Sequence, residues 1–350
     1  MRSSNYTIGL DLGDRRHHVC VLNGRAQPVA EEVIANTREN LLVLSARFPR
    51  ATFIMETGTH SPWVSRFLEE QGHRVLVANA RKLRAISDNH TKNDAEDARM
   101  LARLGRADES LLSPIKHRSE RAQRALVRLK VREVLVRSRV NQMNSVRFLL
   151  KSLGLVVPSG SKAMTFTRRL RPMLDEATRR LVEPLLTMID ALNAKVAELD
   201  GELEAYGRSE CPVTEQLRQI DGVGPLPALA FVLTIDDPNR FANTRDVGAY
   251  LGLVPKRDQS GETDKQLPIT KAGNRQLRCL LVNCAHYILG PFGPPSRLRE
   301  AGERIAARGG KTAKKRAVIA VARKLAVTLL ALWKSGRTYE ALPAARPHAA

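Results

Sequence analysis

Aromatic residues and cysteines are scarce in this chain. Phe, Trp and Tyr make up 4% of its 350 residues, so a recognition surface built mainly on stacked nucleobases is less expected than one built on phosphate contacts. The four cysteines form no CxxC pair and no zinc-ligand spacing: Cys20, Cys211, Cys279 and Cys284. We therefore expect reduced thiols, as in a cytoplasm, rather than disulfides or a zinc site.

The chain also lacks long apolar runs, and its acidic residues are too few to balance its basic ones. No apolar stretch reaches the roughly 18 residues that a membrane-spanning helix needs. Charged residues interrupt the N-terminal segment, where a signal peptide would need an apolar run. Lys and Arg number 57 against 36 Asp and Glu, which gives a formal net charge of +21. This excess predicts a nucleic-acid partner and no membrane partner.

The first third of the chain alternates between strand and helix patterns. Strands are predicted at 6–13, 17–23, 28–37, 51–57 and 73–80, and helices at 38–48, 62–72 and 94–107. The stretch "NGR" marks a tight turn between the second and third strands. Three antiparallel strands followed by alternating helices and strands predict an α/β domain.

Two later segments have the spacing of coiled-coil helices. The first has apolar residues seven apart (Ala122, Leu129, Val136, Met143, Leu150, with Leu126 and Val140 between them). It is cationic, because residues 118–151 hold ten Lys and Arg against two acids. The second has acidic flanks and the seam Leu185, Ile189, Leu192, Val196, Leu199 and Leu203. The two helices fold back on each other, pair between chains, or form a plain spacer.

The last third is mostly helical and strongly basic. The stretch "LRQIDGVGPLPALAFVL" has small turns at Gly222 and Gly224 between apolar helices, which is typical of a helix-hairpin-helix that meets phosphates through backbone N–H groups. Residues 304–324 hold eight Lys and Arg and no acid, a run that repels itself unless an anion is present. The candidate phosphate ligands, including three from the cationic helix, are Arg124, Arg128, Arg132, Lys256, Lys271, Asn274, Arg275, Arg278, Lys311, Lys314, Lys315 and Arg316.

Four acids in the first third carry the candidate chemistry. Asp11 interrupts an apolar strand, where an ionised carboxylate is costly unless something pairs with it. Glu56 ends a strand, and Asp94 and Asp97 are three apart and so share a helix face. Taken one at a time, each acid has another interpretation. Asp11 could lie in a turn at the end of a strand, Glu56 could be a surface residue, and Asp94 could be a helix N-cap. Together they predict a hard-oxygen site for Mg²⁺ or Mn²⁺, which suits phosphoryl transfer.

Several motifs resemble one family over nearly the whole chain. "GLDLG", "METG", "KNDAEDARMLA", "DGVGPLPALA", "YLGLVPKRDQSGETDKQLPITKAGNRQLR" and "KTAKKRAVIAVARKL" are similar to those of the DEDD-type transposases of bacterial insertion sequences, recombinases guided by a bridge RNA. The resemblance implies an N-terminal RuvC-like (ribonuclease-H-like) metal-binding catalytic domain at 1–115, a coiled-coil segment at 116–206, a C-terminal transposase domain at 207–340 and a tail at 341–350.

The resemblance also implies roles for single residues. Asp11, Glu56, Asp94 and Asp97 form a metal tetrad in it, and Ser260 in "KRDQSGE" is a nucleophile that joins DNA as a phosphoserine and leaves a free 3′ hydroxyl. By residue type alone, a Ser-Gly pair is an ordinary turn. The partners implied are donor and target DNA, a structured guide RNA and further copies of the chain in a dimer or tetramer. A cytoplasmic, nucleoid-associated prokaryotic protein is expected.

Three other functions fit parts of the pattern. A Holliday-junction-type metal-dependent nuclease needs the same acids but uses water in place of Ser260. An actin-like or sugar-kinase-like ATPase shares the "GLDLG" phosphate loop, although a second glycine-rich phosphate motif is not evident. The third alternative is a nucleic-acid-binding or structural protein, in which the four acids have no catalytic role.

Overall fold

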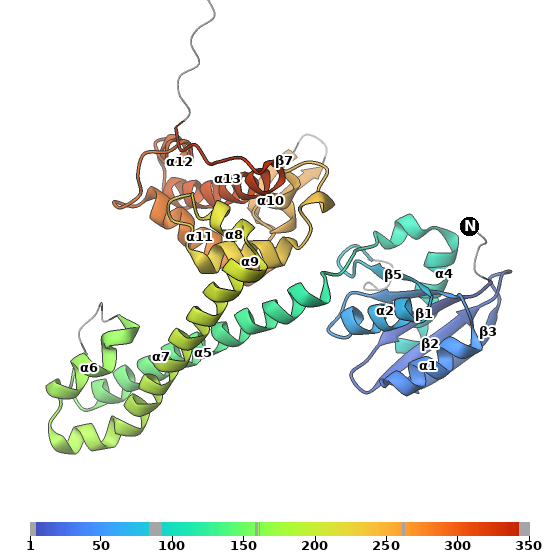
Figure 1. Cartoon of the computed structure of the whole chain (residues 1–350), viewed down its shortest axis with the longest axis horizontal. Coiled ribbons are helices and arrows are strands. Elements are labelled where there is room, and N and C mark those ends of the chain that lie inside the picture. Colours follow the sequence, from blue (N-terminus) through green and yellow to red (C-terminus); the bar gives the residue numbers. More distant parts are fainter. Residues whose placement is uncertain (1–4, 84–92, 158–159, 161, 261–262, 343–350) are drawn as a thin grey trace, which may run out of the picture. The chain divides into compact units, whose positions relative to one another are not determined.

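The computed structural model describes residues 5–83, 93–157, 160, 162–260 and 263–342. The chain divides into two compact units, unit 1 from Met1 to His117 and unit 2 from Arg118 to Ala350 (Figure 1). No helix among the described residues is long and apolar enough to cross a membrane.

Unit 1 is built on one mixed sheet with the strand order β3-β2-β1-β4-β5. The strands are β1 (Thr7–Leu12), β2 (Arg16–Leu22), β3 (Pro28–Ala35), β4 (Thr52–Glu56) and β5 (Arg74–Ala78). β1 is antiparallel to β2 and parallel to β4, and β4 is parallel to β5. The predicted α/β class is confirmed for this part of the chain.

Helices cover both faces of this sheet. Successive side chains of a strand point to opposite faces, and both faces carry apolar residues. Ile8 and Leu10 face a core that includes Leu41 of α1 (Arg38–Arg47) and Val64 of α2 (Ser61–Glu70). The other face is covered by α4 (Asp94–Ala107), whose Ala98 packs on β2. A short helix, η1 (Glu109–Leu112), follows α4. Residues of β1 with odd numbers, Asp11 among them, therefore share the face of α4.

Glycines bring α4 against the sheet. A Cβ atom on Gly9 would lie 2.0 Å from the backbone oxygen of Ala98 and 2.7 Å from the backbone nitrogen of Ala102. On the helix side, a Cβ atom on Gly105 would lie 1.9 Å from Cδ1 of Ile54 in β4. The helix therefore runs directly over β1 and β4, and its first turn reaches the end of β1.

Replacing Gly9 with alanine is expected to lower the free energy of unfolding by about 1–3 kcal/mol, because the new methyl group meets helix backbone that cannot move aside locally. Urea denaturation of the full chain, followed by circular dichroism, measures the change. The matched control is Gly58→Ala, where a Cβ atom meets nothing within 4 Å. Equal stability of Gly9→Ala and wild type would contradict the close approach.

Two long helices open unit 2. α5 (Glu120–Ser152) and α7 (Glu176–Glu210) pack against each other in antiparallel directions, since Arg121 bonds Glu210 while Arg132 bonds Asp200. Their far ends are joined by η2 (Ala163–Thr165), α6 (Phe166–Leu170) and η3 (Arg171–Met173). Of the predicted arrangements, the structure shows the two helices folding back on each other within one chain.

The predicted apolar seams are only partly buried. On α5, Leu129, Met143 and Leu150 are buried as expected, but Val140 is 44% exposed. On α7, Ile189, Val196, Leu199 and Leu203 are buried as expected. Leu186 and Asn193 are also buried, whereas the predicted seam residues Leu185 and Leu192 are only half-buried. The polar Asn193 accepts a hydrogen bond from Arg139 of α5 at 3.0 Å. The packing is therefore less regular than a continuous heptad seam predicts.

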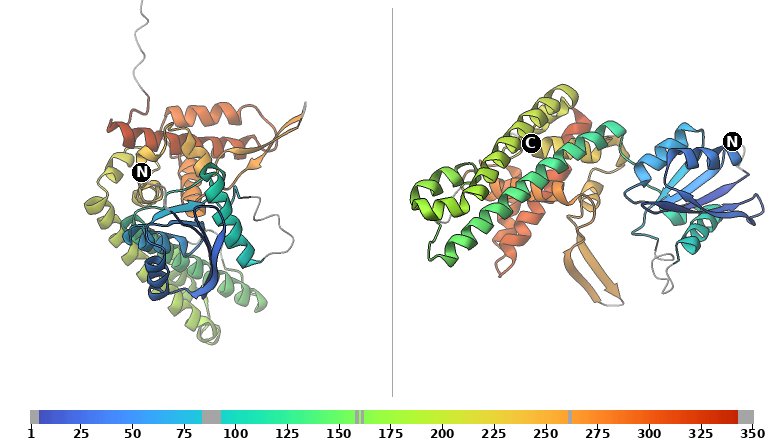
Figure 2. Two further views of the ribbon diagram at one scale, coloured as in Figure 1. Left: turned by 90° about the vertical axis from the view of Figure 1, so that its right-hand side faces the viewer. Right: turned by 90° about the horizontal axis from the view of Figure 1, so that it is seen from below.

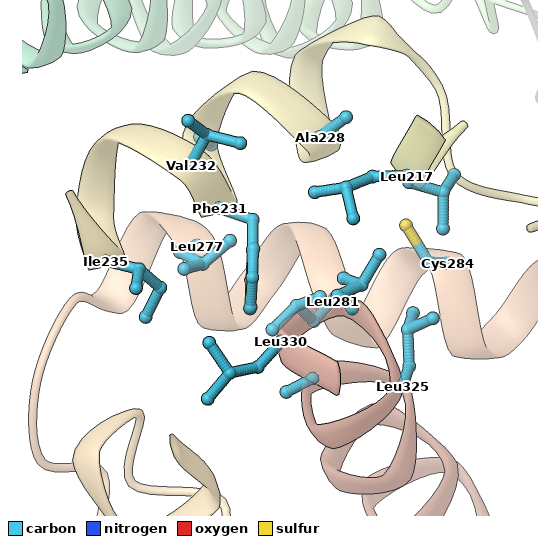
Figure 3. Packing of buried hydrophobic residues seen from close by; sticks show 14 of the residues in the cluster. Leu217, Ala228, Phe231, Val232, Ile235, Leu277, Leu281, Cys284, Leu325 and Leu330 are labelled. Atoms are coloured by element: carbon cyan, nitrogen blue, oxygen red, sulfur yellow. The ribbon is translucent and has the colours of Figure 1, made fainter. Parts of the chain in front are cut away.

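The rest of unit 2 is a helical core with one hairpin. Three helices meet around Phe231, Leu281 and Leu325 (Figure 3): α9 (Pro225–Ile235), α11 (Arg275–Leu289) and α13 (Ala313–Ser335). The shorter helices are α8 (Val213–Leu217), η4 (Pro238–Arg240), α10 (Asp246–Tyr250) and α12 (Arg297–Ala306). An antiparallel hairpin of β6 (Pro255–Ser260) and β7 (Thr263–Ile269) extends from these helices (Figure 2).

Candidate metal centre and nucleic-acid surface

Three neighbouring strands of unit 1 each place one polar residue on the α4 face at the same level. In the antiparallel pair, Asp11 of β1 lies opposite His18 of β2. In the parallel pair, Leu10 lies opposite Met55, so the next residues, Asp11 and Glu56, lie side by side at or next to the ends of their strands. We call His18, Asp11 and Glu56 the strand-end row. This row lies next to the part of the sheet against which Ala98 and Ala102 of α4 pack.

The first turn of α4 adds two carboxylates to this row. Asn93 is the N-cap, with its side-chain oxygen accepting the backbone N–H of Ala95. The alternative interpretation of Asp94 as the N-cap is therefore wrong, and Asp94 is the first helical residue. Asp94 and Asp97 lie on the side of the helix that continues into buried Ala98. Carboxylates in a first turn are also stabilised by the helix dipole.

Three of the four predicted acids converge. One carboxylate oxygen from each of Asp11, Asp94 and Asp97 lies within 4.8 Å of the others. Asp94 is exposed, whereas Asp11 and Asp97 are half-buried. Glu56 lies on the same face but is not part of this group. Three hard oxygen donors at such short separations fit a divalent cation such as Mg²⁺ or Mn²⁺, which also offsets their mutual repulsion.

A network of hydrogen bonds connects the turn after β1 with the segments that hold Asn36 and His60. His60 Nδ1 accepts a hydrogen bond from Trp63 Nε1 at 3.2 Å, so its proton is on Nε2, which donates to Asp14 Oδ1 at 3.0 Å. Asn36 Nδ2 donates to the backbone oxygens of Gly13 at 3.3 Å and Asp14 at 3.1 Å. The network holds the turn that follows Asp11 against two other loops. No local sequence pattern indicates this network, because its members are far apart in the chain.

His17 lies on the opposite face of β2 from His18 and has no exposed surface. Burial lowers the pKa of His17 to about 4, so its ring is neutral at pH 7. The dipeptide "HH" in an otherwise apolar strand was the available signal for both residues. One of these histidines belongs to the core and the other to the strand-end row.

Ser260 is the last residue of β6 and pairs with Thr263 across the hairpin. Its side chain lies outside the part of the chain that the structure describes. It belongs to unit 2, whereas the three converging acids belong to unit 1. Its nucleophilic role therefore stays a prediction.

Comparison with known families matches two segments of the chain. A transposase family model, DEDD_Tnp_IS110, matches residues 8–154, and a model for transposases of the IS116/IS110/IS902 family matches residues 214–298. A Sinorhizobium fredii protein named transposase y4qE is 30% identical over 285 residues, which is 79% of this chain and 70% of that protein. This chain belongs to the IS116/IS110/IS902 family of transposases.

Other relatives are matched over a larger share of their own length. A family 20 transposase of Pseudomonas aeruginosa is 26% identical over 81% of this transposase and 83% of its own chain. The transposase for insertion sequence element IS1328 of Yersinia enterocolitica is also 26% identical, with the same coverage. This transposase is thus an enzyme that cuts and rejoins DNA. The junction-nuclease interpretation is not favoured.

The basic residues predicted on α5 are engaged within the transposase itself. Arg124 pairs with Glu120 at 2.6 Å, and Arg132 pairs with Asp200 of α7 at 2.6 Å. The Arg128 guanidinium lies 5.7 Å from the ring centroid of Tyr206. Arg128 and Arg132 therefore help to hold α5 against α7, whereas Arg124 is paired within α5.

The predicted ligands of β6 and of the segment after β7 divide into structural and exposed residues. Arg278 is 9% exposed and donates to the backbone oxygens of Leu251 at 2.9 Å and Ala272 at 2.6 Å, so it holds a loop in place. Asn274 caps α11 by accepting the backbone N–H of Leu277. Three other cations are exposed: Lys256, Lys271 and Arg275.

The clearest cationic surface is at the start of α13. We call its four exposed members, Lys311, Lys314, Lys315 and Arg316, the α13 cationic cluster. Buried Ala313 and Ala317 anchor this turn of the helix, so the basic side chains face outward. Within the described part of the chain, none of the four forms an ion pair with an acid. These charges remain available for an anionic partner.

Neutralising the α13 cationic cluster with four glutamines is expected to weaken binding to duplex DNA and to lower the slope of log Kd against log salt by about 3 to 4, since each phosphate contact contributes about 0.9. Fluorescence anisotropy over a salt series measures both. The matched control replaces Arg124, Arg128, Lys130 and Arg132 of α5 with glutamine. An equal loss of slope in the control would contradict the distinction between paired and unpaired cations.

Proposed function

We propose that the transposase recombines DNA under the guidance of a structured RNA, through a covalent bond between Ser260 and DNA. The observation that carries the proposal is the convergence of Asp11, Asp94 and Asp97 in a member of a DEDD-type transposase family. Glu56, which ends the neighbouring strand, completes the acid set in this proposal.

The sheet of unit 1 supports a RuvC-like catalytic domain. Three antiparallel strands are followed by two parallel ones, and the acids gather at the carboxyl ends of β1 and β4. In the proposal, residues 1–115 form this domain, residues 116–206 form a helical insert, and residues 207–340 form the transposase domain, with a tail at 341–350. The Gly222–Gly224 turn before α9 is a helix-hairpin-helix that contacts the DNA backbone.

The acids hold a divalent cation, Mg²⁺ or Mn²⁺, which supplies positive charge against the reacting phosphate oxygens when bound. Ser260 Oγ forms a bond to phosphorus as the bond from phosphorus to the 3′ oxygen breaks. The hydroxyl proton is transferred to that oxygen, which leaves a phosphoserine and a 3′ hydroxyl. A 3′ hydroxyl from another strand then attacks the phosphoserine, and the serine regains its proton. The bond energy is conserved, so strand exchange needs no ATP.

The partners follow from this chemistry. In this proposal, catalysis requires both the acids and Ser260, supplied by one chain or by two protomers of a dimer or tetramer. Base pairing with the RNA selects donor and target DNA, while the protein contacts phosphates through residues such as the α13 cationic cluster. Since the substrate is DNA of the bacterial chromosome, we place the transposase at the nucleoid in the cytoplasm.

Mapping a covalent adduct tests the proposal. The full-length protein is incubated with a labelled DNA carrying its insertion-sequence end, denatured, digested and analysed by mass spectrometry. A DNA-linked peptide that contains Ser260 is expected. RNase treatment before the reaction is expected to abolish cleavage at the specific site. An adduct on another residue, or specific cleavage that survives RNase, would overturn the corresponding half of the proposal.

A further inference from the structure

Phe292 is an exposed aromatic residue in the loop between α11 and α12, and the function described above does not use it. Of the eight phenylalanines, all of which the structure describes, only Phe148 and Phe292 are exposed. The side chain of Phe292 is 80% exposed. In a chain with so few aromatic residues, a ring placed in solvent is available to a partner.

The loop that carries Phe292 is held in one conformation. Arg299 Nη1 lies within hydrogen-bond distance of three backbone oxygens: Ile288 at 3.1 Å, Gly290 at 2.8 Å and Gly293 at 2.7 Å. A Cβ atom on Gly293 would lie 2.3 Å from the Ile288 oxygen, so the loop packs closely on the end of α11. Three prolines within 291–295 restrict the backbone further. A ring on such a loop loses little conformational entropy when it binds.

The surroundings of this loop suit DNA better than a protein partner. Residues 265–299 contain six Lys and Arg and no acid, and Arg297, just after the loop, is exposed. Within residues 268–300, all of which the structure describes, Tyr287 and Phe292 are the only exposed large apolar side chains. A docking surface for a protein is a wider apolar patch. A single apolar side chain among positive charges is typical of a wedge that enters DNA.

The loop also lies next to the turn at Gly222, which contacts the DNA backbone in the proposed function. Tyr287 packs against both segments. A Cβ atom on Gly222 would lie 2.7 Å from Cδ1 of Tyr287, and a Cβ atom on Gly293 would lie 2.7 Å from its backbone oxygen. Asp221 of the turn and Pro294 of the loop line one small cavity. A backbone contact at the turn would therefore bring DNA to the loop.

We propose that Phe292 inserts between two stacked base pairs of the DNA substrate and bends the duplex at that step. Apolar side chains such as Phe unstack neighbouring bases and kink DNA when they enter a groove. Every base offers a π face, so the contact needs no particular sequence. The inference rests on the proposed function only for the contact at the Gly222 turn. It is independent of the guide RNA, of Ser260 and of the metal centre.

Photo-crosslinking maps the contact. 5-Iododeoxyuridine is placed at successive positions of a duplex insertion-sequence end, because this base crosslinks to aromatic side chains that stack on it. The full-length transposase is bound, irradiated, digested and analysed by mass spectrometry. A crosslinked peptide that contains Phe292 is expected for neighbouring positions of the duplex. Bound DNA without a crosslink to Phe292 at any position overturns this inference and leaves the proposed function untouched.

Variants of Phe292 measure what the ring contributes. Phe292→Ala is expected to weaken binding to the duplex about 5- to 100-fold and to remove the bend, whereas Phe292→Tyr keeps the π face and both properties. Fluorescence anisotropy gives the affinity, and energy transfer between dyes at the two DNA ends gives the bend. The control is Phe148→Ala, the other exposed ring, on α5.

These outcomes separate stacking from a structural role of the loop. Because the ring of Phe292 is exposed, Phe292→Ala is expected to keep the circular dichroism spectrum and the Tm of wild type. Wild-type affinity and bend in Phe292→Ala would contradict the wedge. A defect that Phe292→Tyr shares, or that Phe148→Ala matches, would equally overturn it, because neither result depends on a stacked ring at this position.

Discussion

Replacing Asp11 with asparagine is expected to lower DNA cleavage by about a thousandfold or more. Asparagine has the same shape, so the half-buried position and the strand remain filled, but one of three converging carboxylates loses its charge. The preorganised charge at an active site is worth several kcal/mol to a reaction that transfers phosphate. Cleavage of a labelled insertion-sequence end, together with titration of Mg²⁺ and Mn²⁺ binding, measures the effect.

The control for this variant is Asp14→Asn, three residues further along, in the turn that follows β1. Asp14 is also a carboxylate, but its side chain is 95% exposed and it pairs with His60 rather than joining the acid group. It is expected to retain cation binding and most of the cleavage activity. Cleavage by Asp11→Asn at the wild-type rate would show that the acid group does not serve catalysis, and would favour the interpretation of the four acids as incidental.

Replacing Ser260 with alanine is expected to abolish both the covalent adduct and strand exchange, while cation binding stays unchanged. The variant removes one oxygen from the last residue of β6, and the converging acids belong to a different unit of the chain. The proposed nucleophile and the proposed metal ligands can thus be tested by separate mutations. A denaturing gel with labelled DNA detects the adduct, and isothermal titration with Mn²⁺ measures cation binding.

The neighbouring Gln259→Ala supplies the control for the hairpin. Gln259 is an exposed strand residue beside Ser260, so its loss tests whether any truncation there disturbs activity. It is expected to retain the adduct. If Ser260→Ala still cuts DNA and the wild-type protein also forms no adduct, water is the nucleophile and the reaction is that of a nuclease. That result would remove Ser260 from the mechanism and leave the acid group in place.

Local pattern was sufficient to predict the elements of unit 1. The five strands and three helices predicted between residues 6 and 107 are all present, with bounds that agree within two residues. Alternation of apolar residues and helical spacing depend only on neighbours along the chain, and this sequence follows both closely. Placing Asp94 and Asp97 on one helix face needed only their separation of three residues.

The charges of α5 show where local pattern fails. Residues 118–151 have a large basic excess in the sequence, yet Arg132 pairs with Asp200, which lies 68 residues further along. The same holds for Arg278, whose buried guanidinium bonds two backbone oxygens. A count of charges over a segment cannot include partners from another helix, so it overestimates what is left for DNA.

The sequence by itself determined the mixed first region, the helical remainder, the positive charge and three aspartates at positions where a cation site was predicted. Only the tertiary structure decided that His18 stands beside Asp11, that Glu56 lies outside the converging group, and that the α13 cationic cluster is free of ion pairs among the described residues. The reason is that strand register and helix contacts join residues far apart in the chain, and no local pattern encodes those distances.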